Sequence, residues 1–500
     1  MQNPNLILDI LNTQSKNNLK INRIYRYLYN KDFYILAYNN LTNKINEKPD
    51  DISNKRIDYI INEIKQEKFK WYKSNRDNIL QRHFKFKSLS VNEWRNKIVQ
   101  EVLRMILSAI YENKFLECSH GYRPNRGCHS ALRRIYKKGQ ACDFFIEGHI
   151  KDLFNSIDHD TFLNILKQDI DDGRFIELIR KMLKSNIIEN DFMLYNKSFS
   201  GIYQGGILSP LLINIYLNEF DNWVENNLIP KWNIKEKHPV RIEYRRLNNK
   251  VSYYEKKINI CSDKNEKKIL IKILKDLRKK RNQIKCDYRR LSYTRYADKF
   301  IITFNGTYDE ALNIKSELYN YLKEYLNLQL DDKTRIVSSV ENKNPVTFLG
   351  YNIRAQYGNS YITKGKRALG GVLAFFIPRN VMFNKIKEYT INGKSVCNNK
   401  LLNNNIYDII SIYQKELMSL INYYKFVRNP KLLARIKYVM EISLIKTLAN
   451  KLKISITKVY KKFTSYCRMN NKSYKVIQYI NKDKEIHFGG ISFSRTDIMN

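Results

Sequence analysis

Three positions near the middle of the chain bear on phosphoryl-transfer chemistry. Asp298 lies at the tip of a hairpin predicted over residues 292–304, and a strand predicted over 143–150 ends beside His149. Nucleotidyl transfer needs two Mg²⁺ ions next to the attacking and leaving oxygens, and these ions take carboxylate ligands from several strands. Asp298 is the single carboxylate at this tip, because the next residue is Lys299.

The segments around these positions alternate between helical and strand patterns. Residues 94–112 place apolar side chains at helical spacing, which predicts a helix with one buried face. Two glycine-containing loops, 119–127 and 204–206, each precede a predicted helix, and 347–354 has the pattern of a single strand. We therefore expect an α/β fold to about residue 375.

The sequence beyond about residue 405 is predicted to be all-helical. An apolar stripe repeats every four residues at Leu432, Ile436, Met440, Leu444 and Leu448. A basic row with spacings close to whole helical turns runs along another face and comprises Lys431, Arg435, Lys446 and Lys453. This pattern predicts a helix that packs through its apolar face and presents cations on the other.

The charge of the chain points to a polyanionic partner. Lys and Arg total 89 against 49 Asp and Glu, a net charge of +40, and the commonest polyanion is nucleic acid. Aromatic residues make up 13 % of the chain, which excludes a disordered basic tail. Residues 231–290 hold 21 Lys and Arg against 7 acids. They form either a solvated basic insertion or a phosphate-binding arm.

Other features narrow the class of protein further. The seven cysteines include no CxxC pair, so we expect neither a disulfide framework nor a zinc site. No apolar run reaches the 18 or so residues of a membrane span, and residues 1–20 do not resemble a transit peptide. The abundance of Lys, Asn, Ile and Tyr indicates an A/T-rich genome.

Several motifs, in order along the chain, resemble the group II intron-encoded reverse transcriptase/maturase family, and in particular its degenerate organellar members, such as those of euglenoid plastids. The matching segments are 119–132, 204–217, 293–298, 348–354, 421–424 and 444–449. The resemblance implies a right-hand polymerase frame, an α/β fingers and palm, followed by an all-helical thumb/maturase domain.

The domain boundaries follow from the same resemblance. Residues 1–80 are expected to be an N-terminal extension and part of the fingers, and 81–375 a degenerate reverse-transcriptase fingers and palm that contains the basic insertion. Residues 376–475 are expected to form the thumb/maturase domain, and 476–500 a tail.

The chain departs from the family at its metal ligands. His149 stands where the family has an Asp, and Lys299 replaces the last Asp of the Tyr-Ala-Asp-Asp hairpin, so that Asp298 alone remains. The segment 85–90 also differs. Imidazole suits Mg²⁺ poorly, and an ammonium ~4 Å away opposes each unit of positive charge by about 4 kcal/mol at an effective dielectric of ~20. We expect Lys299 to pair with Asp298, DNA synthesis to be lost, and no cofactor, with Mg²⁺ only if polymerase activity survives.

The resemblance then implies a protein that assists splicing of a group II-type, group III or shortened intron by binding structured precursor RNA. Lys and Arg rows with interleaved Tyr supply phosphate and 2′-OH contacts. The predicted RNA-binding residues are Arg123, Arg126, Lys431, Arg435, Lys446, Lys453, Lys458, Lys461 and Lys462. Gln204, Gly205 and Lys333 are predicted remnants of the template and nucleotide site. Tyr423 and Tyr424 are predicted to pack within a helical bundle and not to stack on bases.

Two other functions stay open. One is an active reverse transcriptase with an altered metal shell, for which Asp152 would have to turn into the site. The other is a general RNA-binding protein without a splicing role. We expect neither a membrane nor a small-molecule substrate, and the sequence leaves the oligomeric state open. The composition favours a plastid over a mitochondrion as the location, with an A/T-rich bacterium as a further alternative.

Overall fold

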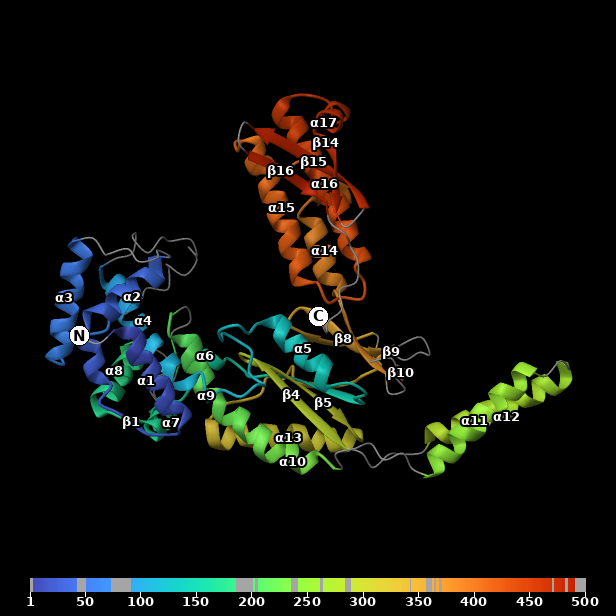
Figure 1. Cartoon of the computed structure of the whole chain (residues 1–500), viewed down its shortest axis with the longest axis horizontal. Helices are drawn as coiled ribbons and strands as arrows, with labels where there is room; N and C mark the ends of the chain where they lie inside the picture. Colours follow the sequence, from blue (N-terminus) through green and yellow to red (C-terminus); the bar gives the residue numbers. More distant parts are fainter. Residues whose placement is uncertain are drawn as a thin grey trace. The chain divides into compact units, whose positions relative to one another are not determined.

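A computed structural model describes the chain except for residues 1–2, 43–50, 73–90, 186–200, 203–205, 235–241, 261–263, 284–288, 342, 357–361, 364–365, 368–370, 470–471, 482–483 and 491–500. The chain divides into two compact units (Figure 1). Unit 1 comprises residues 1–127 and 142–336, and unit 2 comprises residues 128–141 and 337–500.

Helices dominate the first part of unit 1. Around the long helix α4 (Val91–Tyr111), most of which is buried, pack α1 (Pro4–Lys16) and α2 (Lys31–Thr42). The remaining elements are η1 (Tyr25–Tyr29), α3 (Asp51–Lys65), α6 (Leu153–Ser156), α7 (His159–Asp169), α8 (Gly173–Ser185), and the short parallel pair β1 (Ile21–Asn22) and β3 (Ile170–Asp171). The helix predicted over residues 94–112 is therefore confirmed as α4.

A four-stranded sheet carries the candidate catalytic residues of unit 1. Its order is β4 (Arg290–Tyr296), β5 (Lys299–Asn305), β2 (Phe144–His149) and β6 (Arg335–Ser338). The strands β4 and β5 are antiparallel and pair from Arg290–Asn305 to Tyr296–Lys299, so the predicted hairpin is confirmed.

Two helices pack on this sheet. They are α9 (Ser209–Trp223), which continues into η4 (Val224–Leu228) and α10 (Ile229–Trp232), and α13 (Tyr308–Leu326). Phe220 of α9 lies edge-on to Tyr293 and Phe300 of the sheet, and Trp223 stacks on Tyr321 of α13 at 4.3 Å between ring centroids. These contacts join the helices and the hairpin in one apolar core.

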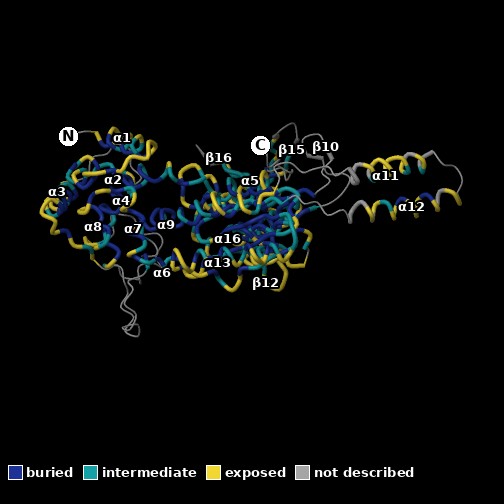
Figure 2. Tube along the Cα trace, turned by 90° about the horizontal axis from the view of Figure 1, so that it is seen from below, coloured by how far each residue is buried: buried dark blue, intermediate teal, exposed yellow. Residues whose placement is uncertain are grey.

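The basic insertion folds as two helices that lie side by side, α11 (Ile242–Ile260) and α12 (Lys264–Gln283) (Figures 1 and 2). Val251, Leu270 and Leu274 are buried. Much of the remaining described surface of the two helices is exposed, as Figure 2 shows. The exposed cations fit both interpretations of the insertion, a solvated surface and a phosphate-binding arm.

Unit 2 begins with α5 (Cys128–Lys138) and a three-stranded sheet in the order β11 (Val372–Phe376), β8 (Tyr351–Gln356) and β7 (Val346–Phe348). A short pair, β9 (Ile362–Thr363) and β10 (Lys366–Arg367), lies between β8 and β11 in sequence. The single strand predicted over 347–354 is wrong, because Leu349 and Gly350 take φ of 47° and 71° and turn β7 back into β8.

Helices follow this sheet in unit 2. They are α14 (Arg379–Lys387), α15 (Ile406–Tyr423), α16 (Lys431–Leu452) and α17 (Ile456–Phe463), with β12 (Thr390–Ile391), β13 (Lys394–Ser395) and η5 (Asn399–Leu401) after α14. In α16, Ile436, Met440, Leu444 and Leu448 are buried and Leu432 is half-buried. The predicted apolar stripe is confirmed.

The C-terminal region is not all-helical, and that part of the fold prediction is wrong. After residue 463, the described residues include an antiparallel sheet of β14 (Thr464–Met469), β15 (Lys472–Asn481) and β16 (Lys484–Gly489). Residues 476–489, expected in a tail, belong to this sheet and pack on α15. The segment 473–480 is rich in Tyr, Val and Ile, residue types that are common in strands. Within the described residues, no helix is both long and apolar enough to cross a membrane.

Candidate functional site

The tip of the β4–β5 hairpin lies beside the end of β2. His149, the last residue of β2, pairs across the strands with Lys299, the first residue of β5. The backbone N–H of Ile150 donates to the carbonyl of Asp298 at 2.9 Å, and Ala297 takes a φ of 55° in the turn. The structure therefore brings His149, Asp298 and Lys299 together, although they are about 150 positions apart in sequence.

The imidazole of His149 lies between two carboxylates. Its Nε2 is 2.9 Å from Oδ2 of Asp298, and its Nδ1 is 2.8 Å from Oδ2 of Asp331. The backbone N–H of Asp331 also donates to the His149 carbonyl at 2.8 Å, which fixes the second carboxylate beside the strand end. A neutral imidazole has one N–H, so only the imidazolium form donates to both carboxylates.

The residues present do not fit the pair of Mg²⁺ ions that the resemblance associates with this position. Among the described residues, no group of three or more His, Cys, Asp or Glu side chains is arranged to hold a metal ion. Both ring nitrogens of His149 face carboxylates, and the exposed Lys299 adds a positive charge at the tip. The partner expected for Asp298 was wrong: within the described part of the chain its ion pair is with His149.

Asp331 is a site residue that sequence reasoning missed. The backbone N–H of Lys333 donates to its Oδ1 at 3.0 Å, and together with the His149 hydrogen bond this holds the pKa of the Asp331 carboxyl below its usual value. The Asp331 carboxylate is thus ionised at neutral pH where it faces the imidazole of His149. Its position 182 residues after His149 gives no local signal, because the two meet only through the fold.

A buried ion pair lies in the same hairpin and was also missed. Arg295 of β4 donates from Nε to Oδ1 (2.8 Å) and from Nη2 to Oδ2 (2.6 Å) of Asp221 on α9, and both side chains are 0 % exposed. Its Nη1 donates to the carbonyl of Ala297 and to Asn214, each at 3.2 Å. The guanidinium therefore ties the turn that carries Asp298 to α9.

The loop after α4 supports the same turn. The backbone N–H of Arg295 donates to the carbonyl of Cys118 at 2.8 Å, and that of His120 donates to the Arg295 carbonyl at 3.0 Å. A Cβ on Gly121 would lie 2.6 Å from the backbone nitrogen of Ala297, so this position needs glycine. The predicted glycine loop thus holds the hairpin through its backbone.

Two arginines of this loop are among the predicted RNA-binding residues. The Arg123 guanidinium is buried, pairs with Glu112, and donates to the carbonyls of Leu116 (2.6 Å) and Ser119 (3.0 Å). Its donors are turned inward, and its RNA-binding role stays a prediction. Arg126 is half-buried and donates to the Glu117 carbonyl at 3.0 Å.

The remaining residues predicted near the catalytic position have separate places. Lys333 is exposed in the turn beside Asp331. The side chain of Asp152 accepts a hydrogen bond from Asn155 at 2.8 Å, so the structure does not turn it into the site. Gln204, together with Gly205 and the segment 85–90, lies outside the described residues.

The predicted basic row in unit 2 is only partly a surface feature. Lys431 and Arg435 are exposed on α16, but the Nζ of Lys446 donates to the Ser395 carbonyl at 2.7 Å. Lys453 lies after the end of α16 in a left-handed conformation with φ 53°, so it does not continue the helical face. The prediction of one continuous basic face is therefore wrong beyond Arg435.

A second basic group lies on the next helix. Lys458, Lys461 and Lys462 are all exposed on α17, while Val459 and Phe463 of the same helix are buried. The three predicted RNA-binding lysines of α17 therefore present their charges to solvent.

The prediction that Tyr423 and Tyr424 pack within a helical bundle is wrong, because both lie against the β7–β8 turn, where Tyr424 is buried and Tyr423 is 38 % exposed. The Tyr423 hydroxyl donates to the Leu349 carbonyl at 2.9 Å, and the Tyr424 hydroxyl donates to the Gly350 carbonyl at 3.3 Å. Their rings also lie 5.8 and 5.1 Å from that of Tyr351. The two tyrosines hold the β7–β8 turn to the end of α15.

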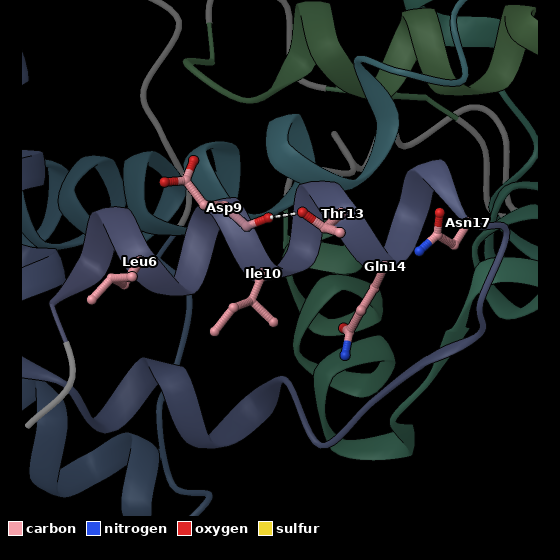
Figure 3. A pocket seen from close by; sticks show the side chains of 6 residues that line it. All are labelled: Leu6, Asp9, Ile10, Thr13, Gln14 and Asn17. Atoms are coloured by element: carbon pink, nitrogen blue, oxygen red, sulfur yellow. Dashed lines mark hydrogen bonds between the residues drawn. The ribbon is translucent and has the colours of Figure 1, made fainter.

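A shallow pocket on α1 is drawn in Figure 3. It is lined by Leu6, Asp9, Ile10, Thr13, Gln14 and Asn17, and the Thr13 hydroxyl donates to the Asp9 carbonyl at 2.8 Å. The lining comes from one helix, holds a carboxylate and includes no cation, which does not suit a polyanionic ligand.

The comparisons with known proteins account for both units. Residues 79–353 match the family model "Reverse transcriptase (RNA-dependent DNA polymerase)", and residues 380–496 match "Type II intron maturase". The chain is 32 % identical to "Group II intron-encoded protein LtrA" of Lactococcus lactis subsp. cremoris, over 91 % of this chain and 80 % of that protein. It is also 32 % identical to "Uncharacterized 91 kDa protein in cob intron" of Schizosaccharomyces pombe, over 91 % of this chain and 58 % of that protein.

A third relative matches a shorter segment. The chain is 36 % identical to "Uncharacterized mitochondrial protein ymf11" of Marchantia polymorpha over 25 % of this chain and 16 % of that protein. Because the reverse-transcriptase match covers more than half of the residues and is followed by the maturase match, the chain belongs to the group II intron-encoded reverse transcriptase/maturase family.

Proposed function

We propose that this protein assists the splicing of a group II-type intron, or a shortened relative of one, by binding its precursor RNA, and that it no longer synthesises DNA. The single observation that supports the loss of synthesis is the contact of His149 with Asp298 and Asp331. In this arrangement the imidazole of His149 is hydrogen-bonded to the carboxylate that remains from the expected metal site.

The charges at this position oppose two divalent ions. The family's three carboxylates would supply three negative charges, whereas here the imidazole of His149 and the ammonium of Lys299 stand at two of those positions. A Mg²⁺ ion would have to displace His149 from both Asp298 and Asp331, and the imidazole that occupies the strand end is a poor Mg²⁺ ligand. We therefore derive no metal-assisted step from this site.

In the proposed role in splicing, the protein binds the precursor RNA and does not itself make or break bonds. The four-stranded sheet with α9 and α13 corresponds to a polymerase palm, and the helices of unit 2 correspond to its thumb and maturase domain. Net charge, +40 over the chain, favours a large RNA as the partner. The exposed lysines of α17 are phosphate contacts in this proposal.

Two assays on the same purified protein test the two parts of the proposal. In primer extension on an RNA template with Mg²⁺ or Mn²⁺, we expect no product above the no-enzyme background, and clear extension would contradict the loss of synthesis. The matched variant His149→Asp/Lys299→Asp restores the two carboxylates. We expect it to bind Mn²⁺, measured by electron paramagnetic resonance, where the wild type does not.

The second assay separates a splicing cofactor from a general RNA-binding protein. RNA that co-purifies with the protein is sequenced, and the intron recovered is transcribed with its exons and incubated at low Mg²⁺ with and without protein. We expect the protein to accelerate excision of that intron and not of an unrelated group II intron. Equal binding to many RNAs with no effect on excision would contradict the role in splicing.

We further infer that the protein acts inside an organelle. The A/T-rich coding of the chain and its similarity to a mitochondrial protein support this inference. The two organelles, plastid and mitochondrion, are separated by fractionating cells of the source organism and detecting the protein with an antibody. Recovery only in the cytosol would contradict the inference.

A further inference from the structure

The C-terminal sheet has one face that is half buried and half open. Residues directly opposite each other in an antiparallel pair point to the same side. At one end of this face Ile477 of β15 pairs with Phe488 of β16, and both are buried, with Phe488 edge-on to Tyr413 of α15. At the other end Tyr466 of β14 pairs with Lys475 of β15. Residues 475 and 477 are two apart on the same strand, so these two pairs lie on the same side of the sheet.

The open end combines an exposed ring with cations. The Tyr466 side chain is 70 % exposed. Its cross-strand neighbour Lys475 is exposed, and so are Arg468 and Ser473, the next pair along the same face. The Nζ of Lys475 lies 4.8 Å from the ring centroid of Tyr460 on α17, which places this helix next to the open end. We call the group of Tyr460, Tyr466, Arg468 and Lys475 the hairpin platform.

The sequence around the hairpin platform contains no acid. From residue 442 to residue 482 the chain holds ten Lys and Arg and no Asp or Glu. At the average frequency of 49 acids in 500 residues, about four would be expected in such a stretch. A solvated surface carries both signs of charge, whereas a surface for a polyanion excludes carboxylates that would repel it.

We propose that the hairpin platform binds an unpaired segment of RNA, with a base stacked on Tyr466 and the adjoining phosphates on Arg468 and Lys475. A base in a duplex offers its faces to its neighbours in the stack, so an exposed tyrosine on an open sheet selects unpaired bases. The lysines of α17 extend the phosphate contacts along the strand. This proposal rests on the proposed RNA-binding function and adds the class of RNA and its location on the protein.

The test measures binding of fluorescent 12-nucleotide RNAs to the full chain by anisotropy across a salt titration. One RNA is unstructured oligouridine and the other is a blunt duplex of the same strand length. For Tyr466→Ala we expect about tenfold weaker binding of the unpaired RNA, since stacking on one aromatic residue accounts for about 5- to 150-fold. Tyr466→Phe keeps the ring and should bind like the wild type. The matched control is Tyr325→Ala on α13 of unit 1, where the exposed fraction is a similar 66 %.

The charge contacts have their own readout. For single strands, each phosphate contact contributes about 0.7 to the slope of log affinity against log salt. Arg468→Ala should therefore make this slope shallower by about 0.7 for the unpaired RNA. The proposal is overturned if Tyr466→Ala weakens binding no more than Tyr325→Ala, or if duplex binding falls by the same factor.

The splicing assay distinguishes failure of this inference from failure of the proposed function. If Tyr466→Ala binds the unpaired RNA like the wild type but the wild type promotes excision, only the platform is wrong. If Tyr466→Ala weakens binding as expected and the wild type does not promote excision, the platform stands and the splicing role is wrong. Unchanged thermal unfolding of Tyr466→Ala, expected for an exposed side chain, shows that lost binding is not lost folding.

Discussion

The buried pair of Arg295 and Asp221 allows a quantitative test of how the site is held. Two variants each remove one partner: Asp221→Asn removes the negative charge, and Arg295→Met removes the guanidinium while keeping a long side chain. The double variant Asp221→Leu/Arg295→Met removes both charges. Because both side chains are 0 % exposed, water cannot solvate the partner that remains.

The magnitudes follow from the contacts. Breaking one partner of a buried ion pair costs about 3–5 kcal/mol of unfolding free energy, because a charge stays buried without compensation. In Asp221→Asn the Tyr293 hydroxyl also loses a charged acceptor at 2.8 Å. The double variant leaves no buried charge but strands Asn214 and the Ala297 carbonyl, at about 1–3 kcal/mol per unpaired group. We therefore expect the double variant to be destabilised by at least about 2 kcal/mol less than the sum of the single variants.

Tryptophan fluorescence in urea measures this effect on unit 1 alone. All four tryptophans, Trp71, Trp94, Trp223 and Trp232, lie within that unit, so the signal does not report on unfolding of unit 2. The midpoint and slope of each transition give the unfolding free energy. Single variants that lose less than about 1 kcal/mol, or a double variant that loses the full sum, would refute the view that an uncompensated buried charge controls this region.

Three further predictions concern other parts of the molecule. Lys446→Ala should lower the unfolding free energy of unit 2 by about 1 kcal/mol, because its hydrogen bond to Ser395 is lost. The exposed Arg435→Ala should change this free energy by less than about 0.5 kcal/mol. Thermal unfolding followed by circular dichroism compares the two variants, and equal effects would contradict the difference in their contacts. Met440→Asp places a charge at a fully buried position of α16 and should leave unit 2 unfolded, seen as rapid proteolysis of residues that resist cleavage in Met440→Leu. Burial holds the pKa of His159 below its ordinary value, so the folded chain binds this proton less readily than the unfolded chain. The stability of the fold therefore falls as the pH drops below about 6.5. In urea titrations His159→Gln should lose less stability than the wild type between pH 7.0 and 5.5, and equal losses in the two proteins would contradict this prediction.

The parts of the fold that were predictable are those with a strong local period. The hairpin of β4 and β5 and the helix α4 were found from alternation and helical spacing. The C-terminal sheet was missed because Ile, Tyr, Lys and Asn fill helices and strands alike in this composition, which weakens intrinsic propensity as a signal. In 347–354 the strand-type residues Phe348, Tyr351 and Ile353 lie on both sides of the turn, and the positive φ at Leu349 is not visible from a residue type that rarely adopts it.

The candidate site was predictable only as far as replaced residues can be read from a motif. His149 and Lys299 show from the sequence that two of the family's carboxylates are replaced. The partner of His149, Asp331, comes from a turn 182 residues later and gives no such signal. Lys446 and Arg435 likewise carry the same charge and belong to the same predicted row on one helix. Lys446 nevertheless donates to a carbonyl, whereas Arg435 is exposed. A sequence pattern shows residue type and periodicity, but it does not show which other element of the fold packs against these residues.

The structure also indicates how charge changes at the hairpin tip are compatible with a folded frame. The side chains at the tip, His149 and Asp298, are 30 % and 34 % exposed, so charge changes there are screened by water and cost little folding energy. The pair of Arg295 and Asp221 is fully buried, and loss of either partner costs about 3–5 kcal/mol of unfolding free energy. In the proposed function, DNA synthesis would need carboxylates at the tip, whereas the fold of the frame depends on the buried pair. Substitutions at the tip can therefore change its chemistry and leave the fold that carries the proposed RNA-binding surfaces intact.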